Sequence, residues 1–245
     1  MIRVAAVGDL HAGLDSMAKI RPRFEDIGRR ADVLVLAGDL TRRGTVEEGK
    51  VLAEELRPAA GSVPVVAVLG NHDYHSGRHE DIRDLLEDAG VRVLEGEGTV
   101  LEVAGARLGI AGSKGFGGGF AGASATPFGE EEMKAFVGHT ERVAAGLEAA
   151  LQGLDADVRV ALLHYSPVEA TLTGERLEIY PFLGSYLLAE AIDRAGADVA
   201  FHGHAHRGIE KGVTSGGVHV RNVAETVIGN AYNVYRLGDG PGSFQ

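Results

Sequence analysis

The sequence lacks several residue types on which many functional sites depend. Its 245 residues include no cysteine and no tryptophan, and aromatic residues make up 6% of the chain. Without cysteine, neither a disulfide framework, nor a thiolate metal site, nor a cysteine nucleophile can form. A transition-metal site would have to be built from His, Asp, Glu and Asn, which favours Mn, Fe or Zn. The scarcity of aromatic residues predicts a core made of Val, Leu, Ile and Ala.

Long apolar runs are missing as well. No segment approaches the roughly 18 uninterrupted apolar residues of a membrane span, so we expect no membrane association. The N-terminus passes from Met1 directly into a strand-like run and lacks the charged, apolar and small-residue regions of a signal peptide. This pattern predicts a cytoplasmic protein.

Positive charge is scarce. The chain carries 35 acidic and 24 basic residues, which gives a formal net charge of -11. A protein that wraps duplex nucleic acid needs many Lys and Arg side chains, so the composition argues against that partner and against a nuclease of long polymers. A small phosphate-bearing substrate remains compatible, because bound metal ions can reverse the field inside one cleft.

The chain shows no internal repeat and no linker rich in Pro, Gly or Ser. We therefore predict a single domain over residues 1–245. Residues 112–129 are dominated by Gly, Ala, Ser and Thr, which predicts a long, mobile loop, either a lid over a cleft or a plain surface loop. Residues 238–245 are expected to form an irregular end.

Short apolar runs alternate with amphipathic stretches in the first half of the chain. The runs are near-continuous, as expected for strands covered on both faces. They lie at residues 2–7, 33–37 and 65–69. Helical spacing of apolar residues predicts helices at 46–56 and 78–88. Thr45 and Glu48 are spaced as a capping box at the start of the first helix.

The rest of the chain has a different order of elements. Strands without helices between them are predicted at 91–94, 99–103 and 106–111, and Gly105 indicates a hairpin between the last two. Beyond these strands we predict helices near 130–151 and around 187–192, and strands at 158–163, 199–202, 218–222 and 231–237. Parallel units followed by antiparallel strands imply a mixed α/β sandwich rather than a simple doubly wound sheet.

Side chains that can bind metal follow five of these strands. They are Asp9 and His11, then Asp39, then Asn71, His72 and Asp73, then His164, and finally His204 and His206. Ligand sites in α/β sheets gather beyond the carboxyl ends of strands, so we expect these groups to reach one edge. Each piece alone is ambiguous, because an Asp-x-His or a His-x-His pair fits a structural role equally well.

The order of these pieces is far more specific than any one of them. Asp9-Leu10-His11, Gly38-Asp39, Gly70-Asn71-His72-Asp73, His164 and Gly203-His204-Ala205-His206 together closely resemble the signature of the calcineurin-like metallophosphoesterases. The resemblance implies a first metal ion held by Asp9, His11 and His206. It implies a second held by Asn71, His164 and His204, with Asp39 bridging both. It also implies a four-layer α-β-β-α sandwich of two mixed sheets flanked by helices.

The resemblance implies that His72 faces the substrate and that Asp73 orients its imidazole. Two divalent or trivalent ions about 3.5–4 Å apart repel each other, so a bridging anion such as Asp39 is needed. Water between such ions becomes hydroxide near neutral pH and can attack phosphorus in line. An imidazole such as His72 then suits protonation of the departing alkoxide. The glycines before Asp39, Asn71 and His204 would permit tight turns.

Substrate contacts are less well specified. The phosphoprotein phosphatase branch of the family has an Asp-Arg-Gly sequence after the bridging Asp, and this chain has Arg42 in place of that Asp, which argues against a protein phosphatase. Arg43 matches the Arg of that sequence and either clamps a phosphate oxygen or is an ordinary solvated residue. Tyr165 and Tyr180 either line a substrate pocket or pack as ordinary aromatic residues.

We therefore predict a dinuclear-metal-dependent phosphoesterase that acts on a small phosphate ester, with nucleotides among the possible substrates. Monoester and diester hydrolysis both fit the ligand set, and the sequence specifies neither the native metals nor the oligomeric state. The alternative is a catalytically inactive metal-binding scaffold of the same fold. Such a scaffold should have lost ligands or the substrate-facing histidine, whereas here every ligand position and His72 are present.

Overall fold

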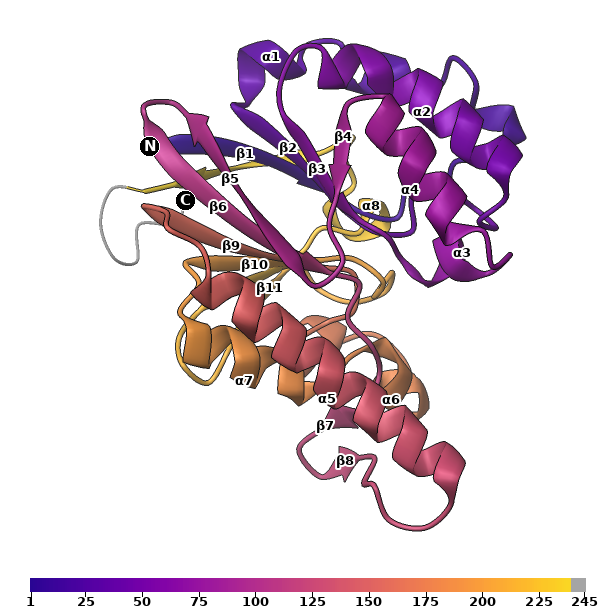
Figure 1. Ribbon diagram of the computed structural model, residues 1–245, viewed down its shortest axis with the longest axis vertical. Helices are drawn as coiled ribbons and strands as arrows, with labels where there is room; N and C mark the ends of the chain where they lie inside the picture. The colour runs from indigo at the N-terminus through magenta and orange to yellow at the C-terminus, as the bar shows by residue number, and fades with distance from the viewer. Residues whose placement is uncertain (239–245) are drawn as a thin grey trace.

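Two β-sheets lie face to face at the centre of the protein in the computed structural model, which describes residues 1–238 (Figure 1). The first sheet contains β1 (Ile2–Val7), β2 (Val33–Ala37), β3 (Val65–Val68), β4 (Val91–Val93) and β13 (Asn233–Leu237). Its spatial order is β13-β1-β2-β3-β4, and β13 is antiparallel to β1 whereas the other pairs are parallel. The chain thus returns at its end to the sheet in which it began.

The second sheet is also mixed. It contains β5 (Glu97–Val103), β6 (Ala106–Ser113), β9 (Val158–Leu163), β10 (Val199–His202), β11 (Lys211–Val213) and β12 (His219–Asn222). Its order is β11-β12-β10-β9-β6-β5, with parallel central strands and antiparallel edges. The predicted hairpin joins β5 to β6, and Ala104 and Gly105 take positive φ values in its turn. The edge strand β11 was not predicted.

Helices cover the outer face of each sheet. The first sheet carries α1 (Ile27–Arg30), α2 (Val46–Ala60) and α4 (His79–Asp88), and the second carries α5 (Glu131–Gln152) and α7 (Tyr186–Ala195) (Figure 1). Short helical turns complete the chain: η1 (Leu14–Ser16), η2 (Arg21–Phe24), α3 (Asn71–Tyr74), η3 (Glu169–Leu172), η4 (Leu177–Ile179), α6 (Tyr180–Leu183) and α8 (Glu225–Ile228). The predicted four-layer sandwich of two mixed sheets is confirmed.

The apolar strands are continuous because both of their faces are buried. In β1, Val4 packs between the two sheets together with Val160 of β9, whereas the neighbouring Ala5 packs under the helices of the first sheet with Leu52 of α2. Alternate residues of one strand thus serve two different cores. This double burial fixes the strand ends at the edge where the polar residues emerge.

The start of α2 differs in part from the predicted capping box. Thr45 Oγ1 accepts a hydrogen bond from the Glu48 backbone N at 3.2 Å, as expected for a helix N-cap. The Glu48 carboxylate does not return to Thr45 and instead accepts from the Arg43 backbone N at 2.7 Å. The helix start therefore anchors the loop that leaves β2.

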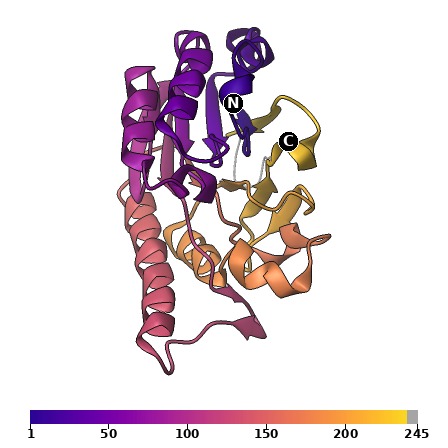
Figure 2. The ribbon, with the colours of Figure 1, turned by 90° about the vertical axis from the view of Figure 1, so that its right-hand side faces the viewer.

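The Gly-rich segment 112–129 has more structure than predicted. Its first residues belong to β6, and β7 (Gly119–Phe120) pairs with β8 (Ala123–Ser124) in a small antiparallel ribbon. Backbone bonds from Gly118 and Gly119 to Pro181 and Gly184 tie this ribbon to α6. The prediction of one long loop over residues 112–129 is thus wrong for these strands. The ribbon and the N-terminal end of α5 project beyond the sheets (Figure 2).

Two further predictions from the sequence concern a membrane span and the C-terminal residues. Within residues 1–238, none of the helices combines the length and the apolar character that a membrane crossing requires. The predicted irregular end lies, apart from Gly238, outside the described residues.

Candidate metal centre

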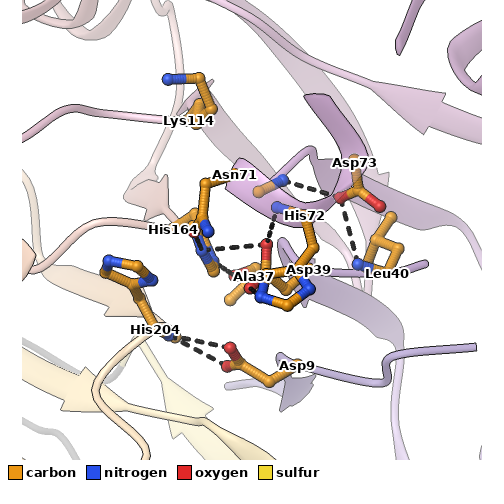
Figure 3. Close-up of polar contacts among 12 residues, drawn as sticks. Asp9, Ala37, Asp39, Leu40, Asn71, His72, Asp73, Lys114, His164 and His204 are labelled. Carbon is orange, nitrogen blue, oxygen red and sulfur yellow. Dashed lines mark hydrogen bonds and ion pairs between the residues drawn. The ribbon is translucent and has the colours of Figure 1, made fainter. Parts of the chain in front are cut away.

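The residues that the sequence singled out converge where strands of both sheets end. Asp9, Asp39 and Asn71 follow β1, β2 and β3 of the first sheet, whereas His164 and His204 follow β9 and β10 of the second. Figure 3 shows side chains from these five segments pointing toward a common space. The site therefore forms only because the two sheets pack against each other.

A first cluster contains four residues whose ligand atoms all lie within 4.8 Å of one another, namely Asp9, His11, Asp39 and His206. His206 Nε2 lies 2.9 Å from Asp9 Oδ1 and 3.5 Å from His11 Nε2. Ring nitrogens and carboxylate oxygens that converge in this way present several lone pairs to one point. Such a mixed oxygen and nitrogen donor set suits Mn, Fe or Zn.

A second cluster shares Asp39 with the first. Asp39, His164 and His204 also have ligand atoms within 4.8 Å of one another. His164 Nε2 lies 3.2 Å from Asp39 Oδ1 and 2.9 Å from Asn71 Oδ1, so the amide oxygen of Asn71 adds a fourth donor. Asp39 is the residue that the two clusters have in common, which is the arrangement a bridging carboxylate requires.

The electrostatics of the second cluster suit a cation. Burial lowers the pKa of His164, but the charge and hydrogen bond of Asp39 outweigh it and raise the pKa of His164 to about 9. Burial favours the neutral form of Asp39, yet the facing His164 holds the pKa of this carboxyl well below its usual value. Burial and the neighbouring His164 lower the pKa of His204 to about 3, which keeps its ring neutral and able to donate a lone pair.

The backbone at this edge is strained. Four of the seven predicted ligands have positive φ values, which are uncommon for residues other than glycine: Asp9 at 61°, His11 at 45°, Asp39 at 49° and His204 at 71°. Each such conformation costs on the order of 1–3 kcal/mol and persists only where the surrounding structure enforces it. Strain concentrated on predicted ligands is typical of a functional site.

Two glycines leave room for the carboxylates. Gly70 has an ordinary φ of -112°, but a Cβ at this position would overlap the Oδ1 and N atoms of Asp39. A Cβ on Gly203 would likewise overlap a carboxylate oxygen of Asp9. We predicted that these glycines permit tight turns, and Gly38, with φ at 80°, fits that reason. Gly70 and Gly203 are instead required by close approach.

His72 lies beside both clusters with an open ring edge. Its Nε2 is 3.8 Å from Asp39 Oδ2, and its ring centroid is 4.6 Å from that of His11. Its Nδ1 lies 2.8 Å from the backbone oxygen of Arg42, a distance at which Nδ1–H donates to that carbonyl. This contact orients the ring and leaves Nε2 directed at the site.

Asp73 does not orient the His72 ring, and this part of the prediction is wrong. Its fully buried carboxylate accepts hydrogen bonds from the backbone N atoms of Leu40, Thr41 and Gly70 and from Thr41 Oγ1. Consecutive residues of a helical turn point in different directions, so His72 and Asp73 of α3 cannot face each other. Asp73 instead joins the loop after β2 to the loop after β3.

The two arginines after Asp39 lie at the surface. The Arg42 guanidinium pairs with Asp15 at 2.9 Å, and its backbone oxygen is the group that contacts His72. Arg43 is exposed, and its backbone is held by Glu48 and Ser76. A phosphate contact by the Arg43 side chain stays a prediction.

A pocket of about 430 Å³, here called the side pocket, opens next to Asn71. Its lining includes Tyr74, Lys114, Phe116, His139 and Tyr165. Tyr165 is one of the two tyrosines for which the sequence analysis allows a pocket role, whereas Tyr180, the other, packs elsewhere and its hydroxyl donates to the Leu172 oxygen. Lys114 and Phe116 escaped prediction because they lie in the Gly-rich segment, where no periodic pattern indicates which side chains turn inward.

Comparisons with known proteins show the family and the fold of this chain. An uncharacterized metallophosphoesterase of Aquifex aeolicus (strain VF5) is 35% identical to this chain over 103 residues. The aligned segment covers 39% of this chain and 37% of the length of that relative. Among solved structures, phosphopantetheinyl hydrolase from Mycobacterium tuberculosis has a similar fold, with a TM-score of 0.67 and 16% sequence identity over 97% of this chain and 96% of that chain. The model of the calcineurin-like phosphoesterase family matches residues 2–208, a range that includes every residue of both clusters. The chain therefore belongs to the calcineurin-like phosphoesterase family.

Proposed function

We propose that this protein is a dinuclear-metal-dependent phosphoesterase that hydrolyses small phosphate mono- or diesters. The observation that carries the proposal is that two clusters of metal-binding groups share a single carboxylate, Asp39. A lone structural metal site would need only one of these clusters. The strained backbone at four of the seven predicted ligands supports the same conclusion, because strain of this kind is kept where function requires it.

In this proposal the chain holds two ions through the two sets of residues described above. Asp9, His11 and His206 bind the first ion, Asn71, His164 and His204 bind the second, and Asp39 binds both. When bound, Mn, Fe or Zn ions supply positive charge for the phosphate oxygens and lower the pKa of the attacking water. Asn71 is a neutral ligand, so the set contains only two carboxylates and keeps its attraction for an anionic substrate.

His72 is the proposed proton donor to the leaving group. Its Nδ1–H is engaged by the Arg42 carbonyl at 2.8 Å, so Nε2 is the atom that can carry and release a proton toward the substrate. The ring is held yet accessible, since 44% of its side chain remains exposed. An imidazole with one fixed nitrogen and one open nitrogen suits general acid catalysis.

The competing proposal is a metal-binding scaffold without catalysis. It shares the two clusters but gives no role to an open His72 Nε2 or to the side pocket next to Asn71. Turnover distinguishes the two proposals directly, because a scaffold binds metal without hydrolysing any ester.

The test combines metal content with turnover. We expect about two ions per chain by elemental analysis, and hydrolysis of bis-p-nitrophenyl phosphate, p-nitrophenyl phosphate or both after loading with Mn, Fe or Zn. Asp39→Asn should reduce both metal content and rate, whereas His72→Ala should reduce the rate by about 100-fold or more while retaining the metal. Asp84→Asn, an exposed position on α4, is the matched control for the first change. A protein with two bound ions and no phosphoesterase activity would support the scaffold instead.

A further inference from the structure

The side pocket lies where the organic part of a bound phosphate ester would extend. Asn71, the proposed ligand on this side of the centre, forms part of its lining. Lys114 lies beyond Asn71, at the opposite end of the group from Asp9 (Figure 3). A phosphate held between the two clusters would therefore have its ester group next to this pocket.

Flat rings form a continuous wall from the metal centre into the side pocket. The Tyr165 ring centroid is 4.4 Å from that of His204 and 5.9 Å from that of Phe116. Phe116 in turn meets His139 edge to face, with centroids 4.6 Å apart. Aromatic faces of this kind bind flat rings through stacking, and an alkyl group gains less from them.

Lys114 adds a directed donor to this aromatic pocket. Its ammonium lies 5.1 Å from the Tyr74 ring, 5.1 Å from the Phe116 ring and 5.3 Å from the Tyr165 ring. An ammonium has three N–H donors, and the bond of 3.1 Å from Lys114 Nζ to the Gly115 oxygen uses one of them. The remaining donors can meet a ligand that carries acceptor atoms.

Hydrogen bonds to Glu95 hold the backbone at Lys114 in place. Its backbone N and the Ser113 hydroxyl both donate to the Glu95 carboxylate at 3.2 Å. A few well-placed polar groups in a mainly apolar pocket set the orientation of a ligand. A nucleobase combines the two properties that this pocket matches, because it is flat and carries carbonyl and ring-nitrogen acceptors.

We propose that the side pocket binds the nucleoside part of a nucleotide ester, with the base stacked on Phe116 and Tyr165 and with Lys114 donating a hydrogen bond to an acceptor on the base. The inference rests on the proposed function, since that function places the phosphate at the two clusters. It assigns Phe116 and Lys114 as residues that determine specificity.

The experiment compares two diesters with the same leaving group on the metal-loaded full-length chain. One is the p-nitrophenyl ester of thymidine 5′-monophosphate, and the other is ethyl p-nitrophenyl phosphate. We expect kcat/KM to favour the nucleoside ester by at least about tenfold. Phe116→Leu and Lys114→Met should each lower this preference by about fivefold or more. Phe128→Leu, at a side chain that is 87% exposed, and Lys50→Met, at an exposed lysine, are the matched controls and should keep it.

The outcomes separate the inference from the function on which it rests. Equal kcat/KM for the two diesters would overturn the inference about the side pocket. The proposed phosphoesterase function would still be supported, because both esters are hydrolysed. If neither ester is hydrolysed, the proposed function fails, and titration calorimetry of the wild-type protein with thymidine still decides about the pocket. Saturable binding of thymidine that is weakened in Phe116→Leu supports the inference, and no binding overturns it. The calorimetric test on the wild type does not depend on the stability of any variant.

Discussion

Replacing Asp73 by Asn is the sharpest test of what holds the loops that carry the proposed metal ligands in place. The two carboxylate oxygens of this fully buried side chain each accept two hydrogen bonds. Oδ1 accepts from the Thr41 backbone N at 2.7 Å and from its hydroxyl at 2.6 Å, and Oδ2 accepts from the Leu40 N at 3.1 Å and from the Gly70 N at 2.8 Å. An amide has the same shape but only one accepting oxygen, so its NH₂ group must face N–H donors.

The expected loss of stability follows from those contacts. If the amide oxygen takes the place of Oδ1, the backbone N atoms of Leu40 and Gly70 lose their acceptor. If it takes the place of Oδ2, the Thr41 backbone N loses its acceptor while the hydroxyl can rotate away. Each buried N–H without a partner costs about 1–3 kcal/mol, so Asp73→Asn should lower the free energy of unfolding by about 1–6 kcal/mol. Native proteins typically have a total stability of about 5–15 kcal/mol, so a loss of this size is a large fraction.

The assay is denaturant unfolding of the metal-free protein, so that altered metal binding does not contribute to the difference. Burial and the nearby charge of Asp39 raise the pKa of Asp73 to about 6. The measurement is therefore made at about pH 8, where the wild-type carboxylate is ionised. Asp84→Asn, at an exposed residue of α4, should change the stability by less than about 0.5 kcal/mol. An equally small change for Asp73→Asn would refute the view that this carboxylate holds the two loops together.

Three further predictions follow from the geometry of the site and of the core. Gly70→Ala should abolish the binding of at least one metal ion, as measured by elemental analysis, because the added Cβ would overlap Asp39. Gly146→Ala in α5, where a Cβ has space, should instead raise the free energy of unfolding by up to about 1 kcal/mol, as measured by denaturant unfolding. Adding Mn or Zn at about 100 times the dissociation constant should raise the free energy of unfolding by about 2.7 kcal/mol per site, and a thermal melt unaffected by the metal or by a chelator would contradict this. The preference for nucleoside esters should be present at neutral pH and weaken as the pH rises through the pKa of Lys114, because a neutral amine is a weaker donor with one N–H fewer. Burial lowers the pKa of Lys114 despite the opposing charges of Glu95 and Asp39, so the change should come below 10.5, the ordinary value for lysine. Lys114→Arg should retain the preference at that pH.

The sequence predicted those features of the fold that depend on burial over several consecutive residues. Strands such as β1 and β9 are apolar except for one arginine near the start of each, because helices cover one face and the opposite sheet covers the other. Their ends could therefore be placed within a residue, and the polar residues that follow them were recognised as a group. The short edge strand β11 has no such pattern, because its residues Lys211 and Val213 remain exposed at the rim of the second sheet.

Contacts set by the direction of a side chain could not be predicted in the same way. The sequence places Asp73 next to His72, but the helical turn of α3 sends the two side chains to different partners, and the Arg42 backbone oxygen contacts the His72 ring instead. A backbone carbonyl leaves no signature in the sequence. The side pocket was missed for a related reason, since Lys114 directly follows β6 and nothing in the Gly-rich sequence around it indicates that its ammonium lies 5.1 Å from the Tyr74 ring.

The chain leaves the first sheet after β4, builds the whole second sheet, and returns to the first through β13. His164 and His204, the imidazoles proposed for the second ion, lie in the segment between β4 and β13. The two carboxylates, Asp9 and Asp39, lie before that segment. If the protein were cut into two pieces within residues 97–163, neither fragment would carry a complete ligand set. If the proposed function holds, phosphoester turnover in a mixture of the two pieces would report their reassembly, and the protein could serve as a split reporter whose signal depends on the docking of one sheet onto the other.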